Sequence, residues 1–175
     1  MEYRDLYDKD RNLTGKTIKK GDSIPDGFYI IVVLIFIENS NGEFLIQRRS
    51  RTYKDGKLAT TGGHVKIGET SVEGILEEVR EEIGLTLSPS DLILYFSDRE
   101  DSTHVFYDDY YAKVDVDDIS KLELQKNEVD EVLWMTADEI YAAVKSGDFL
   151  KNHVDEFTRL MGWKKTQELP SHFSN

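Results

Sequence analysis

Apolar residues in the first half of the chain fall in short runs separated by polar turns, a pattern typical of strands. Residues 28–38 form a β-branched apolar run, which predicts a central strand buried on both faces. The Asn-Ser-Asn-Gly segment at residues 39–42 predicts a hairpin turn, and residues 43–49 are expected to return as a second strand. This pair is expected to form the core of a sheet.

Further strands are expected on both sides of this pair. Before it, a polar turn at residues 9–12 separates two segments that predict short edge strands at residues 2–8 and 13–20. After it, apolar and aromatic-rich segments predict strands at residues 92–96, 104–114 and 129–135.

Between these groups of strands, an amphipathic pattern predicts a helix. Thr70 and Glu73 form a capping box at its start, and Gly84 marks its end. Its apolar face consists of Val72, Ile75, Leu76, Val79 and Ile83. We expect this face to pack on the sheet.

Two more helices are expected after the last strand. Thr136 and Glu139 form a second capping box, which predicts a helix that ends near Gly147. A final helix is expected over about residues 150–161, followed by a polar tail. Its inner face consists of Leu150, Val154, Phe157 and Leu160.

Glu78, Glu81 and Glu82 share one side of the first helix, beside its apolar face. At about 100° per residue, Glu82 lies about one turn beyond Glu78 with Glu81 beside them. Like charges at these spacings repel, and a hard divalent cation such as Mg²⁺ or Mn²⁺ neutralises such a cluster. The spacing predicts a metal site; the alternative is a solvated acidic face.

The glutamates lie in a longer pattern that favours the metal site. Residues 63–85 resemble the Nudix box, G-x5-E-x7-R-E-U-x-E-E-x-G-U with U an aliphatic residue, and only the arginine position differs, because Glu77 occupies it. The matched positions are Gly63, Glu69, Glu78, Val79, Glu81, Glu82, Gly84 and Leu85. The chain is therefore similar to Nudix hydrolases over roughly residues 28–145, most of its length.

The resemblance implies an α/β fold, specifically a Nudix-type α/β/α sandwich with a mixed β-sheet. Residues 1–175 are expected to form a single domain. Within it, residues 1–25 are expected to form an N-terminal hairpin extension and residues 165–175 a C-terminal tail. The hairpin resembles the extension of Nudix proteins in the type 1 isopentenyl-diphosphate isomerase branch.

The implied activity is that of a metal-dependent pyrophosphohydrolase that cleaves a nucleoside diphosphate linked to another moiety. Glu78, Glu81 and Glu82 are expected to hold Mg²⁺ or Mn²⁺. A loop carbonyl completes the metal shell, and the resemblance favours Gly62 over Gly63 for this role.

A further glutamate is expected in the loop before residues 129–135. Many Nudix hydrolases carry there a glutamate that binds metal or acts as the general base, and Glu128 occupies this position. Glu78 is the rival base, because either carboxylate can accept a proton from a metal-bound water. The expected catalytic residues are Glu78, Glu81 and Glu128.

Basic residues directly before the glycine loop are candidates for binding substrate phosphates, with a solubilising edge as the alternative. They are Arg48, Arg49, Arg51, Lys54 and Lys57. Strand alternation sends Arg48 and Arg49 to opposite faces, so only one of them is expected in a cleft. His64 in the loop can also reach a phosphate, with a merely exposed loop side chain as the alternative. The aromatic residues Trp134, Tyr107, Tyr110 and Tyr111 either stack a nucleobase or fill a sheet face, and we favour the second.

Glu77 leaves two alternative functions open. In the family pattern an arginine braces the catalytic glutamates, whereas Glu77 at i, i+4 repels Glu81. Weakened hydrolysis is favoured, and a non-catalytic nucleotide or metabolite binder is the alternative. An isopentenyl-diphosphate isomerase is less favoured, because the type 1 family uses a cysteine and this chain contains none.

The composition limits the kinds of partner that the chain is expected to bind. The net charge of -12 and the pI near 4.8 disfavour a long nucleic-acid partner but allow a small phosphorylated substrate in a cleft of local positive charge. The longest apolar run, at residues 28–37, is about half a membrane span and follows no basic leader, so no membrane partner is expected. We expect a cytoplasmic monomer or homodimer.

Overall fold

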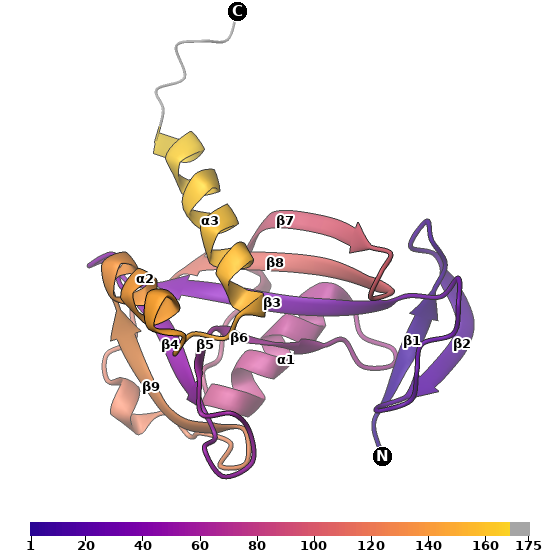
Figure 1. Ribbon diagram of the computed structural model, residues 1–175, viewed down its shortest axis with the longest axis horizontal. Coiled ribbons are helices and arrows are strands. Elements are labelled where there is room, and N and C mark those ends of the chain that lie inside the picture. The colour runs from indigo at the N-terminus through magenta and orange to yellow at the C-terminus, as the bar shows by residue number, and fades with distance from the viewer. Residues whose placement is uncertain (169–175) are drawn as a thin grey trace, which may run out of the picture.

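The computed structural model describes residues 1–168, which form a mixed sheet of seven strands and a separate two-stranded sheet (Figure 1). The central strand β3 (Ile30–Glu38) runs parallel to β8 (Val105–Lys113) and antiparallel to β4 (Phe44–Arg49) and β6 (Thr61–His64). The remaining strands of this sheet are β5 (Leu58–Ala59), β7 (Ile93–Glu100) and β9 (Val129–Met135).

Helices cover both faces of this sheet. Val33 and Ile35 of β3 pack in the core on the side of α1 (Ser71–Ile83). The alternate residues Leu34 and Phe36 pack on the other side. That second core contains residues of α2 (Ala137–Ser146) and α3 (Asn152–Glu168). The three layers confirm the predicted mixed α/β sandwich, and β3 is buried on both faces as expected.

The ends of α1 and α2 agree with the capping residues. The Thr70 hydroxyl accepts from the backbone N–H of Glu73, and Gly84 ends α1 with φ of 69°. Thr136 and Gly147 do the same for α2. Two short 3₁₀ helices lie at Pro89–Asp91 and Ile119–Lys121.

The predicted end of the last helix near residue 161 is wrong. The helix α3 continues to Glu168 because its last turns are held by tertiary contacts. The ring of Trp163 packs 5.5 Å from that of Tyr111, and Lys164 forms an ion pair with Glu38. The first residues of the predicted tail, 165–168, are therefore helical, and residues 169–175 lie outside the described part. Within residues 1–168, no helix is both long and apolar enough to cross a membrane.

The N-terminal hairpin consists of β1 (Tyr3–Tyr7) and β2 (Leu13–Lys19), as the sequence predicts. It lies beside the start of β3 at the edge of the molecule (Figure 1). Its own small apolar core joins Leu6 and Ile18 to Ile30 and Val105 of the main sheet. The hairpin is thereby fixed against the end of the sheet from which the glycine loop departs.

Candidate functional site

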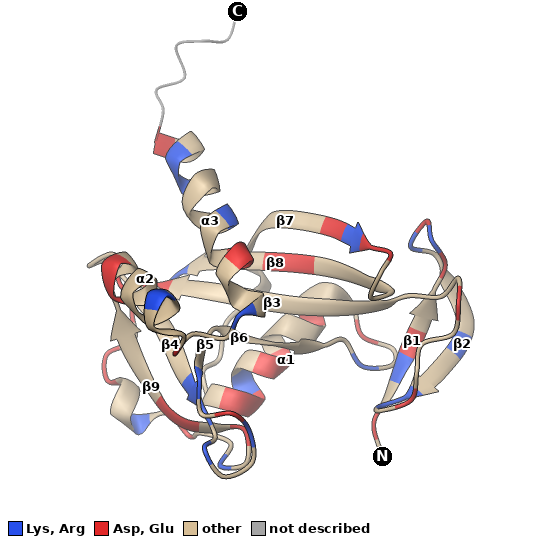
Figure 2. Cartoon of the chain, viewed as in Figure 1, with Lys and Arg blue, Asp and Glu red and all other residues tan. Residues whose placement is uncertain are grey.

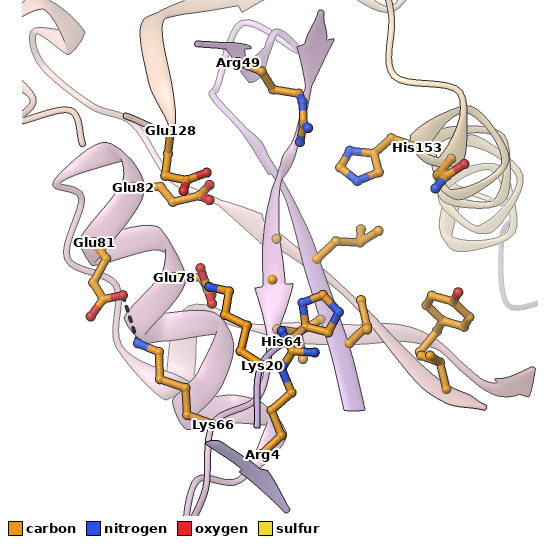
Figure 3. A pocket seen from close by; sticks show the side chains of 18 of the residues that line it. Arg4, Lys20, Arg49, His64, Lys66, Glu78, Glu81, Glu82, Glu128 and His153 are labelled. Atoms are coloured by element: carbon orange, nitrogen blue, oxygen red, sulfur yellow. Dashed lines mark hydrogen bonds and ion pairs between the residues drawn. The ribbon is translucent and has the colours of Figure 1, made fainter. Parts of the chain in front are cut away.

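A cavity of about 520 Å³ opens between the acidic edge of α1, the glycine strand β6 and the N-terminal hairpin (Figure 3). This volume lies in the range of small-molecule sites in proteins. Strands β3, β4 and β8, the loop before β9 and the start of α3 complete its walls. Segments far apart in the chain therefore meet around one space.

The glycine strand lies very close to its neighbours, which explains its two consecutive glycines. Gly62 is paired with Leu34, and a Cβ added to it would lie 2.5 Å from the carbonyl oxygen of Val33. A Cβ added to Gly63 would lie 2.3 Å from the carboxyl group of Glu78. Only glycine leaves room for this carboxyl group against the backbone.

The buried face of α1 directs its glutamates toward the cavity. Ile75, Val79 and Ile83 are buried against the sheet. Glu78 and Glu82 lie at the margin of this face and line the cavity together with Glu81. Packing of the apolar face thus positions the acidic edge.

Two of these carboxyl groups are buried enough to change their acidity. Burial, and then repulsion by Glu82, raises the pKa of Glu78 to about 7. Burial also raises the pKa of Glu82 to about 7, against a lowering hydrogen bond from Gln47 Nε2 at 3.0 Å. Buried, mutually repelling carboxylates are stabilised by a bound cation.

The donor chemistry fits a hard divalent cation, although the side chains do not yet converge on one point. Within residues 1–168, no group of three or more Asp, Glu or His side chains lies close enough to hold a metal ion in this conformation. Glu81 is turned toward Lys66, whose Nζ lies 2.9 Å from its carboxylate. The carboxyl groups of Glu78 and Glu82, and Gly62, whose carbonyl the family resemblance favours as a ligand, do border the same cavity.

Glu128 lies at the same end of the cavity. Its carboxylate lies beside that of Glu82 in Figure 3, and Glu128 contributes to raising the pKa of Glu82. Lys54 Nζ lies 2.9 Å from Glu128 and also lines the cavity. The structure therefore brings Glu128 to the helix glutamates, as the sequence analysis expected of a site residue.

The basic segment before the glycine loop divides between cavity and surface. Arg49 lines the cavity, with its Nε 2.8 Å from Asp55. Arg48 points to the other face of β4, where its Nη1 lies 2.8 Å from Asp148. Among the described residues, neither Arg48 nor Lys57 lines the cavity, so the structure does not support them as substrate contacts. Lys54, a candidate from the same basic segment, does line the cavity.

The predicted repulsion between Glu77 and Glu81 is compensated by neighbouring cations. Lys66, from the glycine loop, lies 2.9 Å from Glu81 and 3.9 Å from Glu77. Arg80 Nη2 lies 3.3 Å from Glu77 and 4.0 Å from Glu81. Arg80 therefore lies near both carboxylates. Figure 2 shows acidic and basic positions interspersed along α1.

Glu69, the first glutamate of the box pattern, adjoins this cluster. Burial, and then the neighbouring Glu77, raises the pKa of Glu69 to about 7. The backbone N–H of Lys66 donates to Glu69 at 3.1 Å. Glu77 therefore lies among Glu69, Lys66 and Arg80 as a member of one hydrogen-bonded and ionic cluster.

Residues that sequence analysis missed also line the cavity. Arg4 and Lys20, from the hairpin and the residue after it, lie at the other end, whereas His153, from the start of α3, lies on the side of Arg49 (Figure 3). His64, which was expected in the site, lies beside Arg4 in Figure 3. Burial, and then the charge of Arg4, lowers the pKa of His64 to about 4, so its imidazole is neutral at pH 7. No local sequence signal marks Arg4 or Lys20, because only folding brings the hairpin to the loop.

The aromatic candidates mostly fill the sheet, as favoured from the sequence. Tyr110 and Tyr111 are buried in the two cores, and Trp134 packs against the first. Tyr107 alone of these four lines the cavity in the described part of the chain.

Comparison with known proteins agrees with this architecture. Residues 29–157 match the NUDIX domain family. An uncharacterised Nudix hydrolase of Listeria monocytogenes is 34% identical over 155 residues, which cover 86% of this chain and 89% of the relative. The ADP-ribose pyrophosphatase of Methanocaldococcus jannaschii is 36% identical over 95 residues, covering 51% of this chain and 56% of that enzyme.

A solved structure gives the same result for the fold. The crystal structure of a protein from Deinococcus radiodurans superposes with a TM-score of 0.71 at 25% identity. The match covers 90% of this chain and 98% of the other. It includes most of the described elements.

Proposed function

This chain belongs to the NUDIX family and is a hydrolase of phosphorus-containing anhydrides, and from this premise we propose that it is a metal-dependent pyrophosphohydrolase of nucleoside diphosphates linked to another moiety. The observation that carries the proposal is the acidic end of the cavity. There Glu78 and Glu82 are held, buried and mutually repelling, against a glycine strand that leaves room for them.

Glu78, Glu81, Glu82 and Glu128, with the Gly62 carbonyl, would hold Mg²⁺ or Mn²⁺. These are oxygen donors of the kind both cations prefer, and a bound cation would lower the raised pKa of Glu78 and Glu82 and so stabilise their ionised forms. Such an ion neutralises phosphoryl oxygens and lowers the pKa of a bound water. Lys66 holds Glu81 in position, a role that the box arginine has in the family pattern.

Glu128 and Glu78 both remain candidates for the general base. Glu128 is held by Lys54 at 2.9 Å beside Glu82, and Glu78 contacts the backbone at Gly63. Both border the cavity, as a base acting on a water in the site must. Arg49 and Lys54, at the same end, are our candidates for binding the diphosphate, and His64 is the candidate at the hairpin end.

The substrate class follows from the cavity and one relative. A volume of about 520 Å³ accommodates a substrate larger than inorganic diphosphate. The relative from Methanocaldococcus jannaschii is an ADP-ribose pyrophosphatase, which makes ADP-ribose the first substrate to test. A small phosphorylated substrate, rather than a long nucleic acid, also suits the net charge of -12.

The test is phosphate-ester product formation from ADP-ribose, dinucleotides, nucleotide sugars and nucleoside triphosphates with Mg²⁺ or Mn²⁺. We expect cleavage of at least one linked nucleoside diphosphate, abolished by a chelator and by Glu82→Gln. Cleavage that is equally fast in chelator would refute the metal dependence. Cleavage confined to triphosphates would refute the substrate class.

The structure does not favour either of the two alternative functions, the non-catalytic binder and the isomerase. The non-catalytic binder depended on an uncompensated Glu77, whereas Lys66 and Arg80 lie 3.9 and 3.3 Å from it. A binder would be recognised by a nucleotide that raises the melting temperature yet remains intact with Mn²⁺. The isomerase remains the least favoured alternative, since the sequence has no cysteine. The similarity of the hairpin to the isomerase branch, the single-domain organisation, the cytoplasmic location and the choice between monomer and homodimer stay predictions.

A further inference from the structure

Arg4 on the hairpin strand β1 differs from the other buried arginines in having no close partner. Its side chain is only 11% exposed, and within residues 1–168 no protein group accepts a hydrogen bond from its Nε. Its nearest ion-pair partner, Glu2, lies 3.8 Å away, beyond hydrogen-bond distance. By contrast, Arg48 donates to Asp148 at 2.8 Å, although its side chain is a little more exposed.

This isolation is costly for a guanidinium group. Burial lowers the pKa of Arg4, while Glu2 and Glu78 raise it, but arginine stays protonated in proteins. A buried charged donor without a partner carries a desolvation penalty that an anionic ligand removes. The environment of Arg4 therefore favours an anion.

The hairpin is attached to the glycine loop on either side of Arg4. The backbone N–H of Ile67 donates to the carbonyl of Tyr3 at 2.9 Å, and that of Gly68 donates to the Asp5 carboxylate at 2.7 Å. Because side chains alternate along a strand, Arg4 points to the opposite side from Tyr3 and Asp5. That side faces the cavity, where Figure 3 shows Arg4 beside His64 and Lys20.

Lys20 adds a second positive charge at this end. Its Nζ lies 2.8 Å from Glu2, and its side chain is 59% exposed, so it can move toward a ligand at little cost. His64 is neutral there and can donate one N–H to an anion without adding charge. Glu2 forms its close ion pair with Lys20 and lies too far from Arg4 to accept a hydrogen bond, so the donors of Arg4 remain available.

We propose that Arg4 and Lys20 form an anion subsite, which binds phosphoryl oxygens of the substrate and makes the N-terminal hairpin part of the substrate site. The planar guanidinium of Arg4 is suited to two parallel hydrogen bonds with a phosphate. The identification of the anion as part of the substrate rests on the proposed function, whereas the anion subsite itself does not.

Binding of inorganic pyrophosphate, measured by calorimetry in chelator, tests the subsite without turnover. We expect the wild-type protein to bind, and Arg4→Met to weaken binding about tenfold or more, as for loss of charge-assisted hydrogen bonds. Arg4→Lys is expected to keep part of the affinity. Lys19→Met removes an exposed hairpin charge outside the cavity and is the matched control, expected to bind as the wild type does.

Two results would overturn the subsite. One is the absence of pyrophosphate binding to the wild-type protein in chelator; the other is equal binding by wild type and Arg4→Met. Far-UV circular dichroism and the melting temperature establish that each variant is folded. If Arg4→Met fails to fold, Arg4→Lys and Lys20→Met decide, and unchanged affinity in both would refute the subsite.

Kinetics on whichever linked nucleoside diphosphate is cleaved separates this inference from the proposed function. We expect Arg4→Met to raise KM about tenfold and to leave kcat within about twofold, because the contact is made equally in the ground and transition states. If the wild-type protein cleaves none of the tested substrates, the proposed function fails, while the calorimetry still decides the subsite. If it cleaves and Arg4→Met leaves both KM and pyrophosphate affinity unchanged, only the subsite fails.

Discussion

The two ends of the cavity are built in opposite ways. At one end, Glu78 and Glu82 come from a single helix turn and are buried carboxyl groups whose pKa is raised to about 7. At the other end, Arg4 and Lys20 come from a hairpin at the start of the chain, and Arg4 is a mostly buried cation without a close partner. The acidic end favours a cation, and the basic end favours an anion.

The difference shows that net charge and local charge are separate properties. The chain carries a net charge of -12, yet five cationic side chains reach one cavity: Arg4, Lys20, Arg49, Lys54 and Lys66. Four of these are matched by nearby carboxylates at 2.8 to 2.9 Å, namely Lys20, Arg49, Lys54 and Lys66. Arg4, at the hairpin end, is thus the least compensated of the five positive charges, and an anionic group gains most beside it.

Neutralising a carboxylate at the acidic end is expected to cause the largest loss of activity. We expect Glu78→Gln to reduce kcat by about a hundredfold or more, because it removes a candidate metal ligand and base. Steady-state kinetics with Mn²⁺ measures the effect, with the exposed Glu73→Gln of the same helix as control. An increase in KM with unchanged kcat would mean that Glu78 contributes to substrate binding, as proposed for Arg4.

Gly63→Ala tests whether the acidic end depends on the close approach of the glycine strand. The added Cβ would meet the Glu78 carboxyl group at 2.3 Å, so this side chain must move. We expect a loss of activity of about tenfold to a hundredfold, since small displacements of reacting groups are costly. Gly162→Ala on α3, where a Cβ meets nothing within 4 Å, is the control. Unchanged kcat would show that Glu78 has no fixed position in the working site.

Charge reversal tests whether Lys66 compensates the charges of Glu77 and Glu81. We expect Lys66→Glu to lower kcat/KM about tenfold, because Glu77 and Glu81 lose their shared cation. The double variant Lys66→Glu with Glu77→Arg is expected to recover most of this loss, since it restores an ion pair of opposite sense. Glu77→Arg alone is expected to give no gain, because Lys66 already supplies the charge. Additive losses in the double variant would contradict the pairing.

The smallest expected effect is on stability as a function of pH. The folded-state pKa of Glu78 and of Glu82 is raised to about 7 from an ordinary value of 4.5. Without metal, the contribution of these groups to the free energy of unfolding is therefore greatest below pH 4.5 and is lost as the pH rises through 7. Mn²⁺ binds the ionised groups, so its stabilising effect increases with pH.

Thermal unfolding with and without Mn²⁺ measures this linkage. We expect the gain in melting temperature from Mn²⁺ to be about 2 to 4 °C larger at pH 8 than at pH 5.5. Glu82→Gln is expected to reduce the difference. An equal gain at both pH values would indicate that the ion does not bind these carboxylates.

The fold was predictable wherever a local pattern carried it. The capping boxes at Thr70 and Thr136 located two helix starts, and the run at residues 28–38 located the central strand. The length of α3 was not predictable, because Trp163 and Lys164 extend it through contacts with distant residues. Local propensity does not contain those contacts.

The same distinction between local pattern and tertiary contact applies to the residues of the site. The acidic edge of α1 was predictable, because helical periodicity places Glu78, Glu81 and Glu82 together. Which of Arg48 and Arg49 faces the cavity was not, because strand alternation separates the two without identifying the buried face. The compensation of Glu77 by Lys66 was also missed, since the loop returns to the helix only in the folded chain.

The acidic end of the cavity follows from the sequence alone, because a glycine loop and a helix within one continuous stretch, residues 63–85, contain its carboxylates at fixed spacing. Which cations line the cavity depends on the tertiary structure. The hairpin at residues 3–19 reaches the cavity through hydrogen bonds to Ile67 and Gly68, about sixty residues later in the chain. Short-range periodicity specifies which side chains share a helix face, whereas contacts between distant segments depend on how the whole chain packs.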